Sequence, residues 1–198
     1  MPTPRLVLAS ASPARRRLLE SAGFAPEIFV TGVPEDDVIG ATKLVVSTLA
    51  RRKAHAAAAH FADVDAVIVG CDSMLDLDGV AQGKPADAEE VRARWHVMRS
   101  RSGILMTGHC LVHPPTGRTV EAVVATTVRF GSPSDAELEH YIATGEPMEV
   151  AGAFTLEGFA APFIDGVDGD PSNVIGLSLP ALRSLLATLG VEMVDLWN

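Results

Sequence analysis

The first thirty residues most constrain the fold, because two apolar runs, 5–9 and 26–30, enclose a helical pattern that ends at Gly23. Short apolar runs predict strands, so the chain is expected to open with a β-α-β unit. Ser12 suits the N-cap of the enclosed helix, and Pro13 suits its first position, where the missing N–H costs nothing. The opening therefore favours an α/β protein.

The rest of the chain continues to alternate apolar runs with amphipathic stretches, which predicts one sheet with helices around it. We expect a helix over 42–60 capped by Thr42, a strand over 66–71, a hairpin turn at Asp78-Gly79 and a helix over 87–98. These are followed by long strands over 104–113 and 118–130, a helix from Ser134 that Gly145 closes, and a helix over 179–189 before a short final strand. Turn residues between the two long strands favour antiparallel pairing. The predicted fold class is α/β with a mixed central sheet and flanking helices.

The composition favours one domain over residues 1–198, because a chain of this length that is 47% hydrophobic can fill a single core with room for two lobes. A formal net charge of −9 opposes binding to nucleic acid or to an anionic membrane. No apolar run approaches the roughly 20 residues of a membrane helix, and no signal segment opens the chain. We therefore expect a cytoplasmic protein with no nucleic-acid or membrane partner.

The turn between the first strand and the first helix has the residues of an anion site. Ser10 and Ser12 offer hydroxyls, and Arg15 or Arg16 offers directed hydrogen bonds that suit phosphate oxygens. Open N–H groups and the helix dipole also favour a negative group at a helix start. The alternative interpretation is an ordinary capped surface helix.

A second candidate site lies where the apolar strand 66–71 runs into Asp72 and Ser73. Ligands of open α/β sheets gather at the carboxyl ends of strands, so Asp72 is a candidate base or metal ligand. Lys84 and Lys53 are candidate phosphate contacts. The alternative is that Asp72 is a turn residue and that both lysines are solvated surface charges.

Glu35 lies in an acidic loop, and its pairing with Asp72 would suffice for a magnesium site. Nucleotide-bound Mg²⁺ needs only one or two carboxylates, because phosphate oxygens and water complete its coordination. The alternative is that the acidic loop is simply solvated.

Taken together, these motifs resemble the Maf family of nucleoside triphosphate pyrophosphatases, which was first linked to septum formation. The resemblance covers nearly the whole chain and rests on several motifs in the family order: Ser10-Ala11-Ser12-Pro13-Ala14-Arg15, Gly70-Cys71-Asp72-Ser73, Lys84-Pro85, Thr144-Gly145-Glu146-Pro147, Ala151-Gly152-Ala153 and Asn173-Val174-Ile175-Gly176-Leu177.

The resemblance implies an enzyme that hydrolyses NTP or dNTP to the monophosphate and pyrophosphate, with a house-cleaning role. It implies a fold of two lobes around a cleft, related to the inosine-triphosphate pyrophosphatase fold, and a homodimer. Asp72 is then the catalytic carboxylate and, with Glu35, the ligand of Mg²⁺ or Mn²⁺. The remaining positions associated with substrate are Ser10, Ser12, Arg15, Arg16, Lys53, Ser73, Lys84 and Glu157.

Three departures from the family motifs bear on the choice of nucleotide: Ala14, Ser73 and Glu157 stand where the pyrimidine-preferring subgroup has arginine, threonine and glutamine. Those residues are linked to selection of dTTP and UTP, so the expected substrates include modified as well as standard pyrimidine nucleotides. Arg16 is a candidate substitute for the missing arginine. The rival hypothesis is a non-catalytic nucleotide-binding regulator of cell division.

Overall fold

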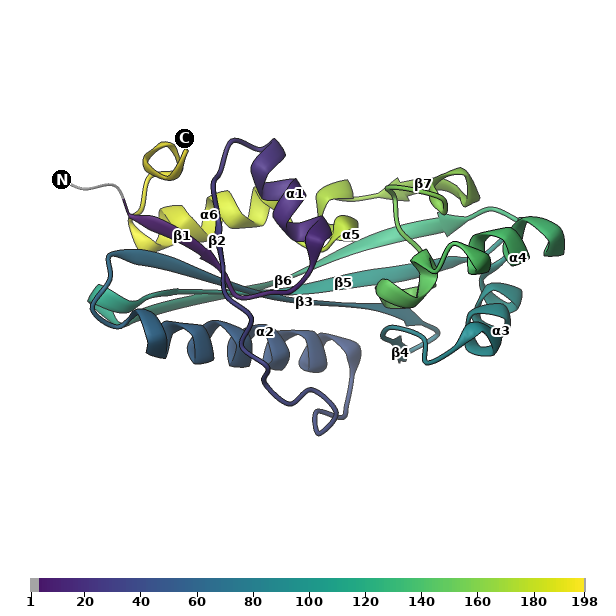
Figure 1. Ribbon diagram of the computed structural model, residues 1–198, viewed down its shortest axis with the longest axis horizontal. Coiled ribbons are helices and arrows are strands. Elements are labelled where there is room, and N and C mark those ends of the chain that lie inside the picture. Colours follow the sequence, from purple (N-terminus) through teal and green to yellow (C-terminus); the bar gives the residue numbers. More distant parts are fainter. Residues whose placement is uncertain (1–3, 198) are drawn as a thin grey trace.

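A computed structural model describes residues 4–197 of the chain and shows three long strands at its centre. These are β3 (Ala66–Leu77), β5 (Ser102–His113) and β6 (Arg118–Phe130), which pair antiparallel along most of their length. They run the long axis of the molecule (Figure 1). The predicted antiparallel pair of long strands is confirmed, with β3 as a third member.

Four shorter strands complete the sheet, in the order β2-β1-β3-β5-β6-β7 with β4 paired to β3. They are β1 (Arg5–Leu8), β2 (Glu27–Ile28), β4 (Val80–Gln82) and β7 (Ile164–Asp168). The β1 strand pairs parallel with β2 and with β3, whereas every other pairing is antiparallel. The mixed sheet and the opening β-α-β unit are therefore as predicted.

Helices cover both faces of the sheet (Figure 1). The α2 helix packs on one face, and α1, α5 and α6 lie on the other. The bounds are α1 (Pro13–Ser21), α2 (Thr42–Ala58), α3 (Ala88–Met98), α4 (Asp135–Ala143), α5 (Pro171–Ile175) and α6 (Leu179–Leu189), with short 3₁₀ turns at Ala59–Phe61, Pro114–Thr116, Glu146–Glu149, Ala151–Ala153, Ala161–Phe163 and Met193–Leu196.

Local capping explains where two of these helices begin. The Ser12 hydroxyl accepts from the Arg15 backbone N–H at 3.4 Å, and Pro13 takes the first helical position of α1. Ser134 and Glu137 form a capping box at the start of α4, in which each side chain satisfies a backbone N–H of the other. Both starts are as the sequence predicts.

The core divides into two lobes that share the long strands. In the first lobe, β3 buries Val67, Val69 and Cys71 against α1 and α6, while Ile68 packs on the α2 side. In the second lobe, Leu75 of the same strand joins a cluster around Trp95 of α3. The β3 residues between Cys71 and Leu75 therefore lie between the two lobes.

Two glycines let α2 lie close to the sheet. A Cβ at Gly70 would come within 2.6 Å of the Ala54 backbone nitrogen, and a Cβ at Gly108 would overlap the Val46 carbonyl oxygen. Gly70 belongs to β3 and Gly108 to β5, so α2 packs directly on both strands. This close approach brings the α2 side chains within reach of β3.

Three sequence predictions need correction, and two elements were not predicted. The strand predicted over 66–71 continues to Leu77, because its polar second half pairs with β5 and β4. Thr42 does not cap α2, since its hydroxyl donates to Asp76 Oδ2 at 2.6 Å and Ala41 occupies the cap. The final segment is a 3₁₀ turn with one bridge between Phe24 and Trp197, and β7 and α5 were not predicted.

None of the helices within residues 4–197 is both long enough and apolar enough to cross a membrane.

Candidate functional site

The candidate site lies along one edge of β3 where neither neighbouring strand continues. On that edge β1 pairs with Ala66–Val69 and β4 pairs with Leu75–Leu77. Within the described chain, neither strand pairs with residues 70–74, and we call this stretch the open edge of β3. It contains Asp72 and Ser73. The sequence had predicted Asp72 at the end of a strand. This prediction was wrong, because Asp72 lies in the middle of β3.

Strand alternation sends Asp72 and Ser73 to opposite faces of the sheet. Asp72 shares the α2 face with Gly70, which touches that helix, and it pairs with Lys53 of α2. Ser73 lies on the α1 face and is bonded to Arg15 of that helix. The site consequently has one part on each side of the open edge.

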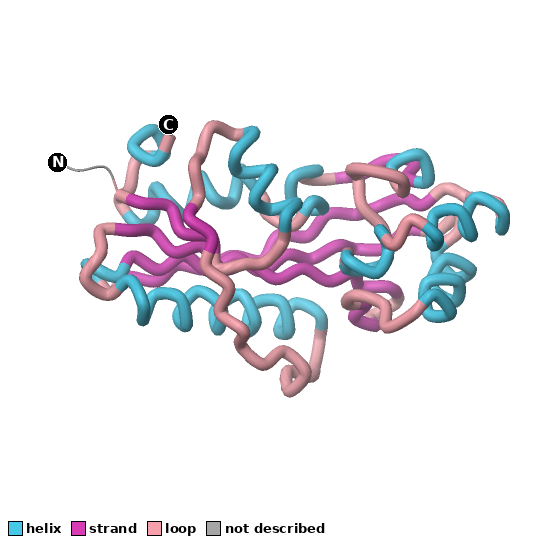
Figure 2. Tube along the Cα trace, in the orientation of Figure 1, coloured by secondary structure: helices cyan, strands magenta, loops and turns pink. Residues whose placement is uncertain are grey.

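On the α2 face, Lys53 bridges two carboxylates. Its Nζ lies 2.7 Å from Asp72 Oδ1 and 2.8 Å from Glu35 Oε1. Glu35 comes from the long loop between β2 and α2, which dips below α2 before it turns into that helix (Figure 2). The structure thus brings Glu35 together with Asp72, the pair expected from the sequence, and adds Lys53, which the sequence suggested only as a phosphate contact.

The Asp72 carboxylate is held in an environment that favours proton uptake. Its side chain is only 9% exposed, and burial raises the pKa of this carboxyl, although the cations of Lys53 and Arg15 oppose the rise. Asp72 Oδ2 is buried and has no hydrogen-bond partner among the described residues. A buried oxygen of this kind is suited to accept a proton or to bind a cation.

On the α1 face, the buried Arg15 guanidinium organises the turn that precedes α1. It donates three hydrogen bonds: Nε to the Gly176 carbonyl oxygen at 2.6 Å, Nη1 to Ser10 Oγ at 3.1 Å and Nη2 to Ser73 Oγ at 2.9 Å. A guanidinium carries five N–H groups, so two remain for a ligand. Arg15 therefore joins the first turn to the open edge of β3.

The two serines of the turn have different partners. The Ser12 hydroxyl is used as the α1 cap, whereas Ser10 Oγ accepts from the Ser12 backbone N–H at 3.2 Å as well as from Arg15. Ser10 lies next to the bound guanidinium and is part of the site. Ser12 stabilises the turn as the N-cap of α1 and is not part of the cluster around Arg15.

Lys84 follows β4 on the second lobe and pairs with Glu149 at 3.2 Å. The structure does not bring Lys84 into contact with Asp72 or Lys53. Lys84 lies two residues after Gln82, which pairs with Leu75 just beyond the open edge. Lys84 is thus placed near the site from the opposite lobe, with an exposed side chain.

The loop that carries Lys84 is held by Arg94 of α3. Arg94 Nη1 donates to the Gly83 carbonyl oxygen at 2.5 Å, and the Gly152 N–H donates to the same oxygen at 3.0 Å.

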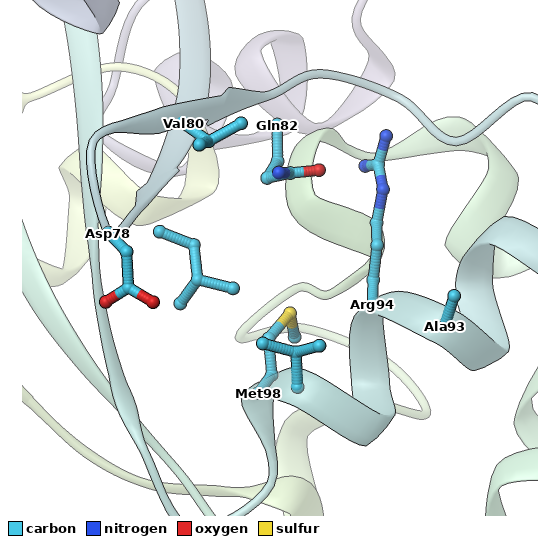
Figure 3. Close-up of a pocket in the computed structure, with 8 residues that line it drawn as sticks. Asp78, Val80, Gln82, Ala93, Arg94 and Met98 are labelled. Carbon is cyan, nitrogen blue, oxygen red and sulfur yellow. The ribbon is translucent and has the colours of Figure 1, made fainter.

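Arg94 also lines a separate cavity of about 360 Å³ between β4 and α3, with Val80, Gln82 and Met98 around it (Figure 3). This cavity contains none of the predicted site residues.

Two further predicted residues lie outside the cluster. Arg16 pairs with Glu20 one turn along α1 at 2.7 Å. Glu157 pairs with Arg17 at 3.7 Å, in a contact between α1 and the loop after residue 153. Their assigned roles in nucleotide selection stay predictions.

The sequence analysis missed three buried polar residues beside the site. Thr107 and His109 belong to β5, and the Asn173 side-chain amide reaches the Leu105 carbonyl oxygen and Thr126 Oγ1. A threonine and a histidine inside the apolar run 104–113 were the available signal, because buried polar side chains need partners. His109 Nε2 accepts from the Ser178 backbone N–H at 2.8 Å.

The donor set suits a divalent cation that a ligand helps to hold. No group of three or more metal-ligating side chains occurs within residues 4–197. Asp72 and Glu35 share one ammonium, and the unpartnered Asp72 Oδ2 offers a further oxygen. Carboxylate oxygens are the ligands that Mg²⁺ prefers, with phosphate oxygens and water in the remaining positions.

The fold and the site together define a mixed α/β protein of two lobes whose charged site lies at an open strand edge between them. The chain belongs to the family described as Maf-like protein, whose family model matches residues 5–189. The resemblance inferred from the sequence motifs is therefore confirmed.

Several relatives are similar over nearly their full length. The nucleoside triphosphate pyrophosphatase of Streptomyces coelicolor is 57% identical over 99% of this chain and 96% of that protein. The protein of the same name from Nocardia farcinica is 50% identical over 99% of this chain and 98% of that protein. A crystal structure of a nucleoside-triphosphatase, dITP/XTP pyrophosphatase, from Mycobacterium abscessus has 18% identity and a TM-score of 0.43 over 93% of this chain and 94% of that one, a likeness too weak to support any inference.

Proposed function

We propose that this Maf-like protein is a nucleoside triphosphate pyrophosphatase that cleaves the bond between the α- and β-phosphates. The observation that carries the proposal is the Lys53 ammonium shared by Asp72 and Glu35, beside a buried Asp72 oxygen without a partner in the described chain. Relatives that are 57% and 53% identical over nearly the whole chain bear this name.

Asp72 is the proton acceptor in this proposal. A water oxygen bonds to the α-phosphorus, and the P–O bond that links the α- and β-phosphates breaks. Pyrophosphate leaves with the electron pair, and the proton lost by water goes to the Asp72 carboxylate. A base works best when its pKa approaches the working pH, and burial raises the pKa of Asp72 in that direction.

The other residues position charge. Lys53 and Arg15 place cations on the two faces of the open edge, and Ser10, bonded to Arg15, presents a hydroxyl in the turn before α1. Asp72 and Glu35 are the residues that would hold Mg²⁺ or Mn²⁺. When bound there, the metal would neutralise phosphate charge and lower the pKa of the attacking water. Lys84 would contact the triphosphate from the second lobe.

We extend the proposal to a homodimer in the cytoplasm, on the strength of the family motifs. Both cysteines, Cys71 and Cys110, are buried free thiols, which is usual for proteins of a reducing compartment. Burial raises the pKa of Cys71 to about 11, so this thiol is inert beside the catalytic carboxylate.

The activity is tested with a panel of standard and modified nucleoside triphosphates in the presence of Mg²⁺, assayed for pyrophosphate and orthophosphate separately. Release of pyrophosphate with the monophosphate supports the proposal. Orthophosphate alone would refute the bond assignment, and tight binding without any hydrolysis would favour the regulator hypothesis.

The role of Asp72 is tested by Asp72→Asn, which removes the base while keeping the shape of the side chain. Turnover should fall by a factor on the order of 10² to 10⁴, with nucleotide binding largely retained. Asp76→Asn is the matched control, because Asp76 lies on the same face of β3 but contacts Thr42 and the Gly79 N–H. Equal turnover in the two variants would remove Asp72 from the mechanism.

A further inference from the structure

Thr107 carries a fully buried hydroxyl and lies next to Ser73 on the adjacent strand, β5. The two residues are register partners in the β3–β5 ladder, and their hydroxyl oxygens lie 2.9 Å apart. Thr107 also lies 3.0 Å from the Asn173 carbonyl oxygen. Among residues 4–197, the Thr107 side chain bonds to Ser73 and to the Asn173 carbonyl oxygen and to no charged side chain, so its influence on a ligand must pass through Ser73.

Arg15, Ser73, Thr107 and Asn173 are linked by a series of hydrogen bonds, and the donor of each bond can be deduced from the groups present. A carbonyl oxygen only accepts, so Thr107 donates its single hydroxyl hydrogen to Asn173. The Ser73–Thr107 contact then requires Ser73 to be the donor. Arg15 only donates, so Ser73 Oγ accepts from Nη2. Ser73 is left with one lone pair and no hydrogen to offer.

Ser10 has the opposite polarity. Its oxygen accepts from Arg15 Nη1 and from the Ser12 backbone N–H, which occupies both lone pairs. Its own hydroxyl hydrogen has no acceptor among residues 4–197. Ser10 therefore offers a donor, which suits a phosphate oxygen, whereas Ser73 offers an acceptor, which a phosphate oxygen cannot satisfy.

We propose that Thr107 is a specificity-determining positioning residue: its oxygen accepts the hydrogen bond of the Ser73 hydroxyl, so that Ser73 pairs with an N–H or O–H of the nucleoside and not with a phosphate oxygen. This inference rests on the proposed nucleotide substrate and deepens it. The hydroxyl of Ser73 is half-buried at the open edge of β3, where a ligand can reach it.

The test crosses protein variants with substrate analogues. The best standard nucleoside triphosphate is compared with analogues that lack one donor each, by N-methylation of the base or by removal of the 2′- or 3′-hydroxyl, and kcat and KM are measured separately. Thr107→Val keeps the shape but frees the Ser73 hydrogen, and Thr107→Ser restores the hydroxyl.

Thr126→Val is the matched control. Thr126 is also fully buried, accepts from the Asn173 amide and donates to the Asp170 carbonyl oxygen at 3.0 Å, but it makes no contact with Ser73. A loss of packing or of the α5 attachment would therefore affect both threonine variants. Only an effect transmitted through Ser73 would be confined to Thr107.

The wild-type enzyme should lose at least about tenfold in kcat/KM on one of the analogues, because an acceptor is left without its donor. Thr107→Val should lose less than about threefold on that analogue, whereas Thr107→Ser and Thr126→Val should keep the full effect. Should Thr107→Val fail to fold, Ser73→Ala removes the acceptor itself and should likewise lose less than about threefold on that analogue. An identical loss in wild type and Thr107→Val overturns the inference.

Failure of the proposed function is distinguishable from failure of this inference. If no nucleotide is hydrolysed, the proposed function is wrong, and the same analogues are compared by calorimetric binding. Equal binding of every analogue by the wild-type protein would then overturn the inference as well. If the wild-type enzyme hydrolyses every analogue as fast as the standard nucleotide, the inference is overturned and the proposed function is kept.

Discussion

Replacement of His109 should change how the stability of the fold depends on pH. His109 is 2% exposed on β5, and its Nε2 accepts from the backbone N–H of Ser178, the N-cap of α6. Burial and, secondarily, the Arg15 cation lower the pKa of this imidazole to about 4, although Asp170 opposes the shift. His109 is therefore neutral in the folded protein at pH 7, with its proton on Nδ1.

The magnitude follows from the pKa difference between the folded and unfolded chains. The unfolded histidine titrates near 6.5 and the folded one near 4, so the unfolded chain binds more protons between these values. Stability contributed by neutral His109 is complete above pH 6.5 and is lost as the pH falls to 4. At 1.36 kcal/mol per pKa unit, the loss amounts to about 3 kcal/mol.

The assay compares urea unfolding of the wild type and of His109→Gln at several pH values between 7.5 and 4, followed by fluorescence of the buried Trp95. The Gln amide oxygen can accept from Ser178 but does not titrate. The free energy of unfolding of the wild type should fall by about 3 kcal/mol relative to the variant over this range. Subtraction cancels the carboxylates common to both proteins.

A control variant, His140→Gln, removes an exposed imidazole from α4 without touching the core. The reasoning is refuted if the difference in unfolding free energy between wild type and His109→Gln stays constant, within about 0.5 kcal/mol, from pH 7.5 to pH 4.

Two further predictions concern the α2 face. In metal-free buffer, carboxyl NMR should give Asp72 a titration midpoint above its ordinary 3.8, and Lys53→Met should raise it further, because Lys53 is the main cation opposing protonation; a lower midpoint in the variant would contradict this electrostatic account. Gly108→Ala should lower the free energy of unfolding by about 3 kcal/mol, because the new Cβ would overlap the Val46 carbonyl oxygen; chemical denaturation that gives an unchanged value would show that α2 can move away from the sheet.

Local patterns allowed much of the fold to be predicted. Hydrophobic periodicity and caps are properties of neighbouring residues, so α1, α3, α4 and α6 were placed from the sequence within a few residues of their observed bounds. The second half of β3 was missed, because Asp72, Ser73 and Asp76 interrupt its apolar run. That half is a strand because it pairs with β5 and β4, which no local pattern reveals.

The site was predicted in its residues more than in its geometry. The sequence pointed to Asp72, Lys53 and Glu35 as candidates, but only the path of the loop before α2 brings Glu35 to Lys53. Thr107 was overlooked because strand alternation gives its face only relative to a partner strand. Its importance depends on Ser73, which is distant in the sequence and adjacent in the sheet.

The unbroken passage of β3, β5 and β6 through both lobes limits how this protein can move. A hinge between the lobes would have to bend three adjacent ladders together, and each broken backbone hydrogen bond would cost about 1 kcal/mol. We therefore expect any conformational change on substrate binding in the segments attached to these three strands: the loop with Glu35, the loop with Lys84 and the turn before α1. These three segments can therefore change position while Ser73 and Thr107, which are register partners on β3 and β5, stay fixed relative to one another.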